Sequence, residues 1–504
     1  MEKRIIPVGI DDMSVYVPHL YLPIETLAEA RAIESAKLNK GLGLVAMALP
    51  DVHEDAATMA ANAALDLLLK NKLDPRRIGR LYVGTESALD GAKPIASYVS
   101  GMLSRYFSNT YGADCLLQCD AVDLTFACIG AVDALQNTLD WVKGAPDRIG
   151  IVIATDFAKY ELGSGGEYTQ GAGAVALLVK QQPRLLAIGD AWGVATADVH
   201  DFFKPVRTFQ RSEVFREALA AAGQDAQEDL PEATVKTTPA LGVFDGTDAQ
   251  IHLHRDTPVF DGQYSNDCYQ DRIGQAYRSF VSAALGHVNG HPGPVLSGRW
   301  SRLVFHLPYA YHGRRIFTEI YTSEALKSGK KAQLEAETGL PVPPEGPDAN
   351  YLKLVAKTPV YQSFVKEFIE KGERASSLVG NVYTGSVFLA LMSLLDAEAS
   401  EGQDLSGKKI GFFAYGSGSK SKVFEGELQP KWREVSAGFQ LMTKLSNRQV
   451  LDYQMYEALH RGKLTQAVAQ PSEGRFSLTN VSNDPLLPGR RSYQWVAATA
   501  MVAQ

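Results

Sequence analysis

The stretch Asp123–Leu135, DLTFACIGAVDAL, holds the change from strand to helix around which the rest of this sequence can be interpreted. The strand-like segment Ala121–Ala127 ends just before Cys128. Apolar residues then recur at helical spacing: Ile129, Val132, Leu135, Leu139 and Val142. The thiol of Cys128 is thus expected at a helix N-terminus, where free amide N–H groups stabilise a thiolate. Since free cysteines also serve as small apolar core residues, position alone leaves both roles open.

Strands and helices alternate on both sides of this stretch. The segment Ala56–Lys70 has one apolar face and predicts a helix, with Asp55 as its N-cap. Strands are predicted at Leu81–Val83, Ile149–Ala154, Ala174–Val179, Arg302–His306, Val379–Val382 and Lys409–Ala414. Because several of these strands are apolar throughout, we expect an α/β fold whose sheet is covered by helices on both faces.

Three other segments differ in composition. The polar, acidic segment Arg211–Asp256 predicts an insertion or a helical excursion on the surface, and Lys327–Asn350 predicts a solvated loop. The last forty or so residues contain Pro, Gly, Asn and Ser between short apolar pieces, which predicts a β-like appendage.

Polar or reactive side chains follow four of the predicted strands. They are Glu86 after Val83, Thr155-Asp156 after Ala154, His306 after Phe305, and Tyr415–Gly418 after Ala414. Ligands of α/β sheets bind where strands deliver their carboxyl ends. The recurrence of such side chains therefore predicts one shared pocket.

The overall composition excludes some classes of partner. The 504-residue chain has a net charge of −7, whereas nucleic-acid and anionic-membrane surfaces select basic proteins. No apolar run approaches the roughly 20 residues that span a bilayer, and no signal peptide is evident at the N-terminus. The four cysteines are too few for a disulfide framework, and Cys115 and Cys119 lack a second ligand pair for zinc. We expect a soluble, cytoplasmic protein without a bound metal.

Glu86 and His306 each have a chemical and a structural interpretation. A carboxylate directly after a buried strand is costly unless it is solvated or used, so Glu86 is a candidate general acid or base. A neutral imidazole at His306 could activate a thiol or bind a thioester oxygen, although strand-end histidines are often structural. His252 and His254 alternate along a predicted surface strand without a third ligand. The glycine-rich segment Gly165–Leu178 lacks the spacing of a nucleotide-binding loop and favours close approach of the backbone to a substrate.

Taken together, these segments resemble the hydroxymethylglutaryl-CoA synthase family of the thiolase superfamily. Eight stretches carry the resemblance in the family's order, between Ile5 and Phe424: VGTESALD (83–90), DLTFACIGAVDAL (123–135), IATDFAKYELGSGGEYTQGAGAVAL (153–177), HDFFKP (200–205), PVFDGQYSNDCY (258–269), FHLPY (305–309), GNVYTGSVFLAL (380–391) and AYGSGSKSKVF (414–424). Together they are a far more specific signal than any one of them alone.

The resemblance implies a role for each candidate residue. Cys128 would attack acetyl-CoA and carry the acetyl group, Glu86 would act as acid and base in the condensation with acetoacetyl-CoA, and His306 would polarise the acetoacetyl thioester and its ketone. Water would then release 3-hydroxy-3-methylglutaryl-CoA, with no metal or redox cofactor. Residues expected to line the site around the substrates are Asn381, Ser417, Tyr160, Thr169, Asp201 and Tyr383.

One departure from the family pattern concerns the substrate handle. The family commonly has a lysine five residues after the strand-end histidine, in a pattern like FHxPxxKxxxK, and Tyr311 occupies that position here. The nearest basic residues, Arg314 and Arg315, are predicted to contact CoA phosphates instead.

Because of this departure, the main alternative function is that of a relative that adds a β-branch to carrier-protein-bound polyketides. An inert thioester-binding homologue is a second alternative, which the joint presence of Cys128, Glu86 and His306 disfavours. A chain-initiating ketoacyl synthase is a third, disfavoured because that class lacks a glutamate like Glu86.

The resemblance also implies the architecture. We expect a thiolase-like core of five αβαβα layers, built from two similar halves at 1–190 and 191–460, followed by an appendage at 461–504. A homodimer across the N-terminal half is expected as well.

Overall fold

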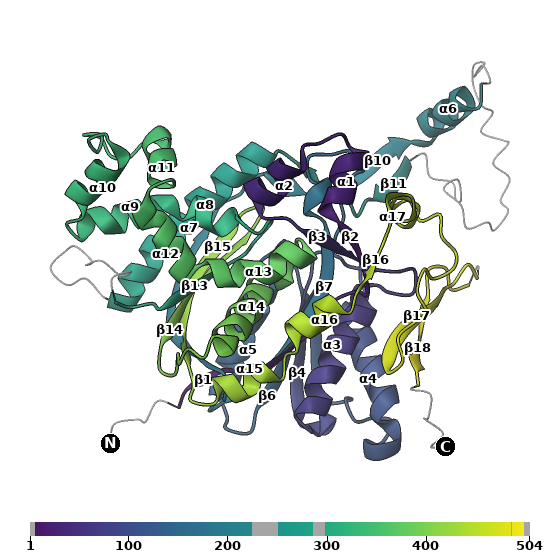
Figure 1. Ribbon diagram of the computed structural model, residues 1–504. Coiled ribbons are helices and arrows are strands. Elements are labelled where there is room, and N and C mark those ends of the chain that lie inside the picture. The colour runs from purple at the N-terminus through teal and green to yellow at the C-terminus, as the bar shows by residue number, and fades with distance from the viewer. Residues whose placement is uncertain (1–5, 224–249, 286–297, 485, 498–504) are drawn as a thin grey trace, which may run out of the picture.

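The computed structural model describes residues 6–223, 250–285, 298–484 and 486–497 (Figure 1). Its centre is one nine-stranded mixed sheet with the order β13-β14-β15-β8-β1-β7-β6-β4-β5. The strands are β1 (Val8–Tyr16), β4 (Ile78–Gly84), β5 (Asp120–Leu124), β6 (Ile149–Ala158), β7 (Gly171–Gln181), β8 (Leu186–Thr196), β13 (Arg302–Phe305), β14 (Lys409–Gly416) and β15 (Lys420–Leu428). Neighbours are parallel at β4–β5, β4–β6 and β13–β14, and antiparallel elsewhere. The predicted α/β class is confirmed.

Helices cover both faces of the first half of this sheet. Along β6, Ile151 and Ile153 belong to the apolar cluster of α3 (Ala56–Lys70) and α4 (Ile95–Tyr111). The alternate residues Val152 and Ala154 belong instead to the cluster that includes α5 (Gly130–Lys143). Because side chains alternate across a strand, α3 and α5 lie on opposite faces.

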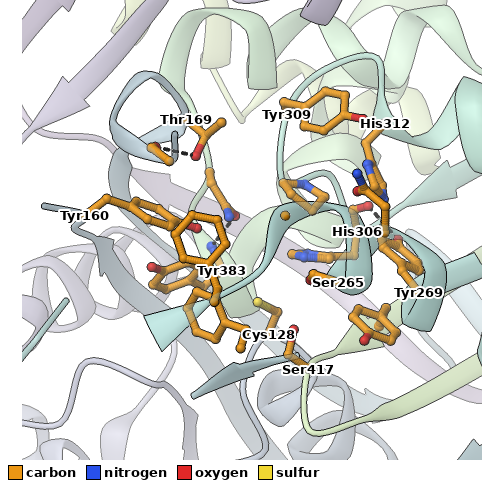
Figure 2. A pocket seen from close by; sticks show the side chains of 18 of the residues that line it. Cys128, Tyr160, Thr169, Ser265, Tyr269, His306, Tyr309, His312, Tyr383 and Ser417 are labelled. Carbon is orange, nitrogen blue, oxygen red and sulfur yellow. Dashed lines mark hydrogen bonds between the residues drawn. The ribbon is translucent and has the colours of Figure 1, made fainter. Parts of the chain in front are cut away.

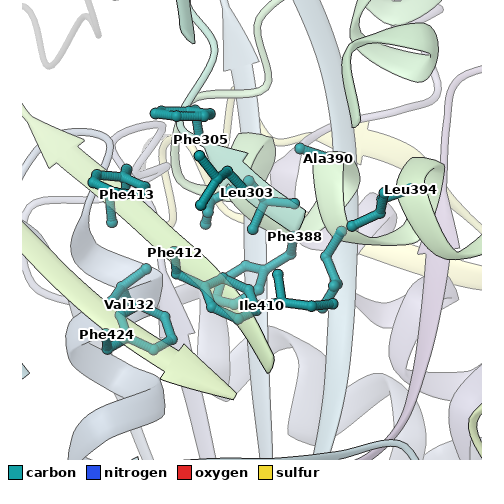
Figure 3. Packing of buried hydrophobic residues seen from close by; sticks show 14 of the residues in the cluster. Val132, Leu303, Phe305, Phe388, Ala390, Leu394, Ile410, Phe412, Phe413 and Phe424 are labelled. Atoms are coloured by element: carbon teal, nitrogen blue, oxygen red, sulfur yellow. The ribbon is translucent and has the colours of Figure 1, made fainter. Parts of the chain in front are cut away.

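The second half of the sheet is covered in the same way. Phe412 of β14 lies with Val132 of α5 and Phe388 of α14 (Ser386–Ser400) (Figure 3). The next residue, Phe413, faces Tyr277 of α7 (Gly262–Leu285), with ring centroids 6.3 Å apart. The fold therefore has five layers. Helices α3 and α4 cover one half of the sheet, α5 and α14 lie between the two halves, and α7 covers the other half. This is the thiolase-like arrangement that the resemblance implied.

Phe412 gives a test of this central packing. Its side chain is fully buried and stacks on Phe424 of β15 at 4.6 Å. We expect Phe412→Ala to lower the free energy of unfolding by about 3–5 kcal/mol, because the truncation leaves a cavity between rigid layers. Chemical denaturation measures this change, with Val450→Ala, at a side chain 55% exposed, as the control. A loss below about 1 kcal/mol at Phe412 would contradict the layered packing.

The remaining strands form small sheets around the core. These are β2 (Leu20–Pro23), β3 (Ala46–Leu49) and β16 (Gln449–Val450) in one sheet, with the pairs β9 (Phe202–Phe203)–β12 (Val259–Phe260), β10 (Val206–Gln210)–β11 (Gln250–His254) and β17 (Arg475–Val481)–β18 (Arg491–Val496). The other helices are α1 (Ile24–Ala30), α2 (Ser35–Leu42), α6 (Arg211–Ala221), α8 (His312–Ile316), α9 (Thr318–Lys327), α10 (Lys331–Thr338), α11 (Ala349–Val355), α12 (Pro359–Phe368), α13 (Glu370–Val379), α15 (Trp432–Ala437), α16 (Leu441–Ser446) and α17 (Tyr453–His460). Within the described ranges, no helix is both long and apolar enough to cross a lipid bilayer.

Several local predictions are confirmed. Asp55 caps α3 by accepting a hydrogen bond from the Thr58 amide at 2.8 Å. The C-terminal appendage contains the β17–β18 hairpin, and its Tyr493 hydroxyl donates to the same Asp55 carboxylate at 2.9 Å. His252 and His254 lie on β11 with exposed side chains.

The expected boundary between the two halves, at residue 190, falls inside β8, which pairs with both β1 and β15.

Two predictions are wrong. The segment Val379–Val382 forms no strand, because Val379 ends α13 and the next residues turn sharply at Gly380, with φ +85°. Lys327–Asn350 contains the whole of α10, whose Leu334 is buried, so the charged segment packs one apolar residue instead of forming a loop. In the predicted polar insertion, Arg211–Ala221 is helix α6, and residues 224–249 lie outside the described residues.

Candidate active site

A cavity of about 300 Å³ opens where the strand ends meet (Figure 2). Residues that reach it come from both halves of the chain, and Cys128, His306 and Ser417 lie on its wall. The predicted shared pocket is therefore present. Other residues named from the sequence that line it are Asn381, Tyr160, Thr169, Tyr383 and Arg315.

The backbone before Cys128 forms a tight turn between β5 and α5. Ala127 has φ +38°, in the left-handed region that residues other than glycine rarely adopt, and α5 begins two residues after the cysteine. The helix start lies directly against the end of β4, since a Cβ atom on Gly84 would be 2.1 Å from the Ala131 amide nitrogen. Glycine at position 84 thus allows the β5–α5 turn and the β4 end to approach each other.

This approach brings Cys128 into contact with Glu86. The Cys128 thiol donates a hydrogen bond to Oε1 of Glu86 across 3.0 Å. Burial, followed by the charge of Glu86, raises the pKa of Cys128 well above its usual value. The sequence predicted a thiolate stabilised by the helix N-terminus, and the raised pKa contradicts that prediction. Burial beside a carboxylate outweighs the helix dipole, so Cys128 is a protonated thiol next to a proton acceptor.

The carboxyl of Glu86 is itself shifted. Burial raises the pKa of Glu86 to about 7, against the opposing effect of Lys204, whose Nζ lies 3.7 Å from Oε2. Near neutral pH the group therefore exchanges between acid and base forms, which suits general acid–base chemistry.

Asp156 holds the Glu86 loop in place. This fully buried carboxylate accepts hydrogen bonds from the Glu86 amide at 2.8 Å and the Ser87 hydroxyl at 2.8 Å. Its other oxygen accepts from the Thr384 amide at 3.0 Å, in the second half of the chain. One buried carboxylate thus fixes the Glu86 loop of one half to the substrate-side loop of the other.

His306 enters the pocket from the end of β13. It is 2% exposed, and burial lowers the pKa of His306 to about 3, so the imidazole is neutral at physiological pH. Its Nδ1 has no hydrogen-bond partner among the described residues, and the Tyr269 hydroxyl fixes the backbone by donating to its carbonyl at 2.7 Å. A neutral ring with an unfilled hydrogen-bonding position can bind a carbonyl or hydroxyl of a substrate.

Asn381 lies in the turn after α13. The backbone N–H of Asn381 donates a hydrogen bond to the Thr169 carbonyl at 3.0 Å. Its side-chain oxygen accepts a hydrogen bond from the backbone N–H of Tyr383 at 2.8 Å. The turn passes so close to β7 that a Cβ atom on Gly171 would lie 2.7 Å from the Asn381 carbonyl oxygen. Gly171 therefore allows the turn that carries Asn381 to pass close to β7. At this position the glycine-rich segment approaches that turn, and not a substrate as the sequence suggested.

Three candidates from the sequence are not on the cavity wall: Glu86, which contacts Cys128, and also Asp201 and Arg314. Asp201 is fully buried and accepts hydrogen bonds from the Tyr415 hydroxyl at 2.6 Å and the Gly418 amide at 2.7 Å. It supports the turn that carries Ser417. Arg314 forms a two-pronged ion pair with Glu373, with Nε 2.9 Å from Oε1, and its guanidinium lies 3.9 Å from the centre of the Tyr311 ring. Arg315 alone of the two arginines lines the pocket, where it is exposed and donates to the Gly41 carbonyl at 2.6 Å.

The structure adds site residues that the sequence reasoning missed. Lys204, in the stretch HDFFKP, donates to the Glu86 carbonyl at 3.1 Å, and His312 is a second buried histidine on the pocket wall. Lys204 could have been predicted from HDFFKP, because that stretch carries part of the family resemblance. His312 could have been predicted from its position directly after Tyr311, where the sequence departs from the family pattern.

Comparisons with known proteins place the chain in a family. The model described as "Hydroxymethylglutaryl-coenzyme A synthase N terminal" matches residues 4–183, and the corresponding "C terminal" model matches residues 250–470. The Haloferax volcanii hydroxymethylglutaryl-CoA synthase is 30% identical over 90% of this chain and 91% of its own length. The Enterococcus faecalis hydroxymethylglutaryl-CoA synthase is 28% identical over 94% and 98%.

A solved structure agrees with these sequence matches. The protein MvaS in complex with 3-hydroxy-3-methylglutaryl coenzyme A is 30% identical, with a TM-score of 0.72 over 97% of this chain and 99% of that chain. The chain belongs to the hydroxymethylglutaryl-CoA synthase family.

Proposed function

We propose that Cys128, Glu86 and His306 carry out the hydroxymethylglutaryl-CoA synthase reaction of this chain, an acyl transfer followed by a carbon–carbon condensation. The observation that carries the proposal is the 3.0 Å contact between the Cys128 thiol and the Glu86 carboxylate, with Cys128 and His306 on the wall of one pocket. A buried nucleophile with a base in contact is the arrangement that covalent catalysis requires.

In the first step Sγ of Cys128 attacks the carbonyl carbon of acetyl-CoA while Glu86 accepts the thiol proton. The bond from the carbonyl carbon to the CoA sulfur then breaks, and Glu86 returns the proton to that sulfur, so that CoA leaves as a thiol and Glu86 is a carboxylate again. This leaves an acetyl thioester on Cys128, so the kinetics are ping-pong.

In the second step the Glu86 carboxylate removes a proton from the acetyl methyl group. The resulting carbanion forms a bond to the ketone carbon of acetoacetyl-CoA, whose oxygen is polarised by the neutral His306. Protonated Glu86 returns its proton to the new alkoxide, and water hydrolyses the thioester to free Cys128 and 3-hydroxy-3-methylglutaryl-CoA. Proximity and general acid–base catalysis supply the barrier reduction, and no metal or redox cofactor enters the scheme.

A steady-state assay with both CoA substrates tests this proposal. We expect one free thiol from acetyl-CoA, and hydroxymethylglutaryl-CoA as the product. The same assay with acetoacetyl groups on an acyl-carrier protein separates the main alternative. Turnover with carrier-bound substrate but not with acetoacetyl-CoA would refute the CoA reaction and favour the β-branching relative. The absence of any acetyl adduct on Cys128 would favour an inert thioester-binding protein.

The pKa of Glu86 gives a pH prediction for the condensation half-reaction. A carboxyl acts as a base only when ionised, so the rate for preformed acetyl-enzyme is expected to rise with pH, with a midpoint near 7. Lys204→Met removes the cation that lowers the pKa of Glu86, so the midpoint moves to higher pH. The rate at pH 7 then falls roughly fivefold, the effect of a one-unit rise in pKa.

Rapid-quench measurements between pH 5.5 and about 9 read this out. Lys159→Met is the matched control, because Lys159 lies beside the pocket residue Tyr160 but pairs with Asp256 on the surface, at 3.1 Å. A midpoint that stays in place in Lys204→Met would show that another group controls the step.

The wider setting is also part of the proposal. We propose a homodimer formed by the N-terminal half, supported by β5, which ends the central sheet with a neighbour on one side only in the described part of the chain and exposes Val122. A cytoplasmic location is supported by four free thiols. The product would supply the mevalonate pathway of isoprenoid biosynthesis. Sedimentation analysis and cell fractionation test the first two points.

A further inference from the structure

His312 is a buried histidine on the active-site wall that the proposed mechanism does not use. Its side chain is 1% exposed, and neither ring nitrogen has a hydrogen-bond partner among the described residues. Burial lowers the pKa of His312 well below its usual value, so the ring is neutral and has one N–H donor and one acceptor. Because buried polar groups almost always have partners, two unpartnered nitrogens on one pocket residue point to a ligand.

The position of His312 in the pocket indicates which part of a ligand it meets. His306, Tyr309, His312 and Arg315 follow one another at intervals of three residues, and all four line the pocket. His306 and His312 are both buried, whereas Arg315 is exposed. Figure 2 shows Tyr309 and His312 together on the far side of His306 from Cys128. This wall therefore offers an imidazole at the reacting end, a second imidazole further out and a guanidinium at the mouth.

The neighbours of His312 fix its ring. The ring centroid lies 4.7 Å from that of Tyr269 and 4.8 Å from that of Tyr309. The adjacent Tyr311 turns away from the pocket and packs against Gly43, where a Cβ atom would be 2.6 Å from its ring. Its amide donates to the Leu42 carbonyl at 3.1 Å. Tyr311, at the position of the family's lysine, thus supports the pocket rim, while His312 faces inward.

Resting on the proposed function, we infer that His312 hydrogen-bonds a secondary amide of the pantetheine arm of the thioester substrates. Beyond its sulfur, that arm carries amides, each with one N–H and one carbonyl, and a neutral imidazole complements both. His306 is the imidazole nearer Cys128 and is assigned to the ketone, and the phosphates of CoA would lie further out, near Arg315. An amide between these two ends matches the intermediate position of His312.

Binding to a Cys128→Ala enzyme tests the inference without turnover. The two ligands are the acetoacetyl thioester of N-acetylcysteamine, which keeps one amide, and the acetoacetyl S-pentyl thioester, in which methylenes replace that amide. Titration calorimetry measures the affinity of each ligand for the Cys128→Ala enzyme and for the same enzyme with the additional substitution His312→Leu. We expect the leucine change to weaken the amide ligand by about tenfold and the pentyl ligand by less than about twofold, since only the amide loses a partner.

Two further variants complete the design. His312→Gln keeps a donor and an acceptor and is expected to restore part of the affinity for the amide ligand. Tyr311→Phe, in the same segment but outside the pocket lining, is expected to change neither affinity. Equal weakening of both ligands by His312→Leu would mean that His312 only shapes the pocket. No weakening of either would mean that ordered water alone fills its hydrogen bonds, and both results overturn the inference.

Failure of the proposed reaction would be seen separately. If the unmodified enzyme forms no hydroxymethylglutaryl-CoA, the proposed function is wrong, whereas the inference on His312 is decided by the amide dependence of binding.

Discussion

Cys128→Ala is expected to remove hydroxymethylglutaryl-CoA formation almost completely, with a loss in kcat on the order of 10⁴-fold or more. The substitution deletes the only protein atom that forms a covalent bond to the acetyl group in the proposed scheme. Without the acetyl-enzyme, both the condensation and the hydrolysis lose their substrate, so residual binding in the pocket cannot rescue the rate. Cys128→Ser is expected to fail as well, because a hydroxyl is far harder to ionise than a thiol in a buried site.

Mass analysis of active-site peptides measures the effect directly. After incubation with labelled acetyl-CoA, the unmodified chain should carry one acetyl group on the peptide containing Cys128, and neither variant should carry it. Cys115→Ala is the matched control, because Cys115 is also a buried free thiol but belongs to the α3–α4 cluster, away from the pocket. Retention of the label in Cys128→Ala would show that another residue is the nucleophile.

Glu86→Ala is expected to separate the two half-reactions. Condensation should fall by about 10²–10⁴-fold, the usual cost of removing a general acid–base. The acetyl adduct should still form, although more slowly. Part of the elevation of the Cys128 pKa comes from the charge of Glu86, so its removal brings that pKa closer to the ordinary range.

The measurement pairs adduct formation with single-turnover condensation on the same samples. Glu54→Gln is a demanding control, since burial also raises the pKa of Glu54 to about 7, yet its carboxylate accepts a hydrogen bond from the Tyr16 hydroxyl, whereas that of Glu86 accepts from Cys128. We expect that control to keep its condensation rate. Equal losses in both half-reactions of Glu86→Ala would mean that Glu86 maintains the site's structure rather than transferring protons.

The local elements of this protein follow largely from the sequence. The periodicity of Ala56–Lys70 and the cap at Asp55 were predicted correctly, because a repeat over several turns and a capping side chain are properties of neighbouring residues. The strand ends at Glu86, His306 and Ser417 were also predicted to meet, since the carboxyl ends of sheet strands meet at one edge. The prediction failed at Val379–Val382, where a turn against β7 overrides the preference of valine for strands.

The protonation states of the site came only from the tertiary structure. The sequence places Cys128 before a helix, which favours a thiolate. The fold buries that sulfur 3.0 Å from Glu86, which favours the protonated thiol. Burial and the distance between residues far apart in the chain depend on how β4 packs on α5, and no local pattern encodes them.

The same distinction applies to the residues proposed to bind the CoA or pantetheine part of the substrate. The sequence by itself indicated the family, made Cys128 the candidate nucleophile and showed Tyr311 at the position of the family's lysine. Only the tertiary structure decided that Arg314 is held by Glu373, that Arg315 reaches the pocket and that His312 faces inward with unfilled hydrogen bonds. Neighbouring side chains on a short helix point in different directions, so the partner that each one finds depends on the elements packed around it.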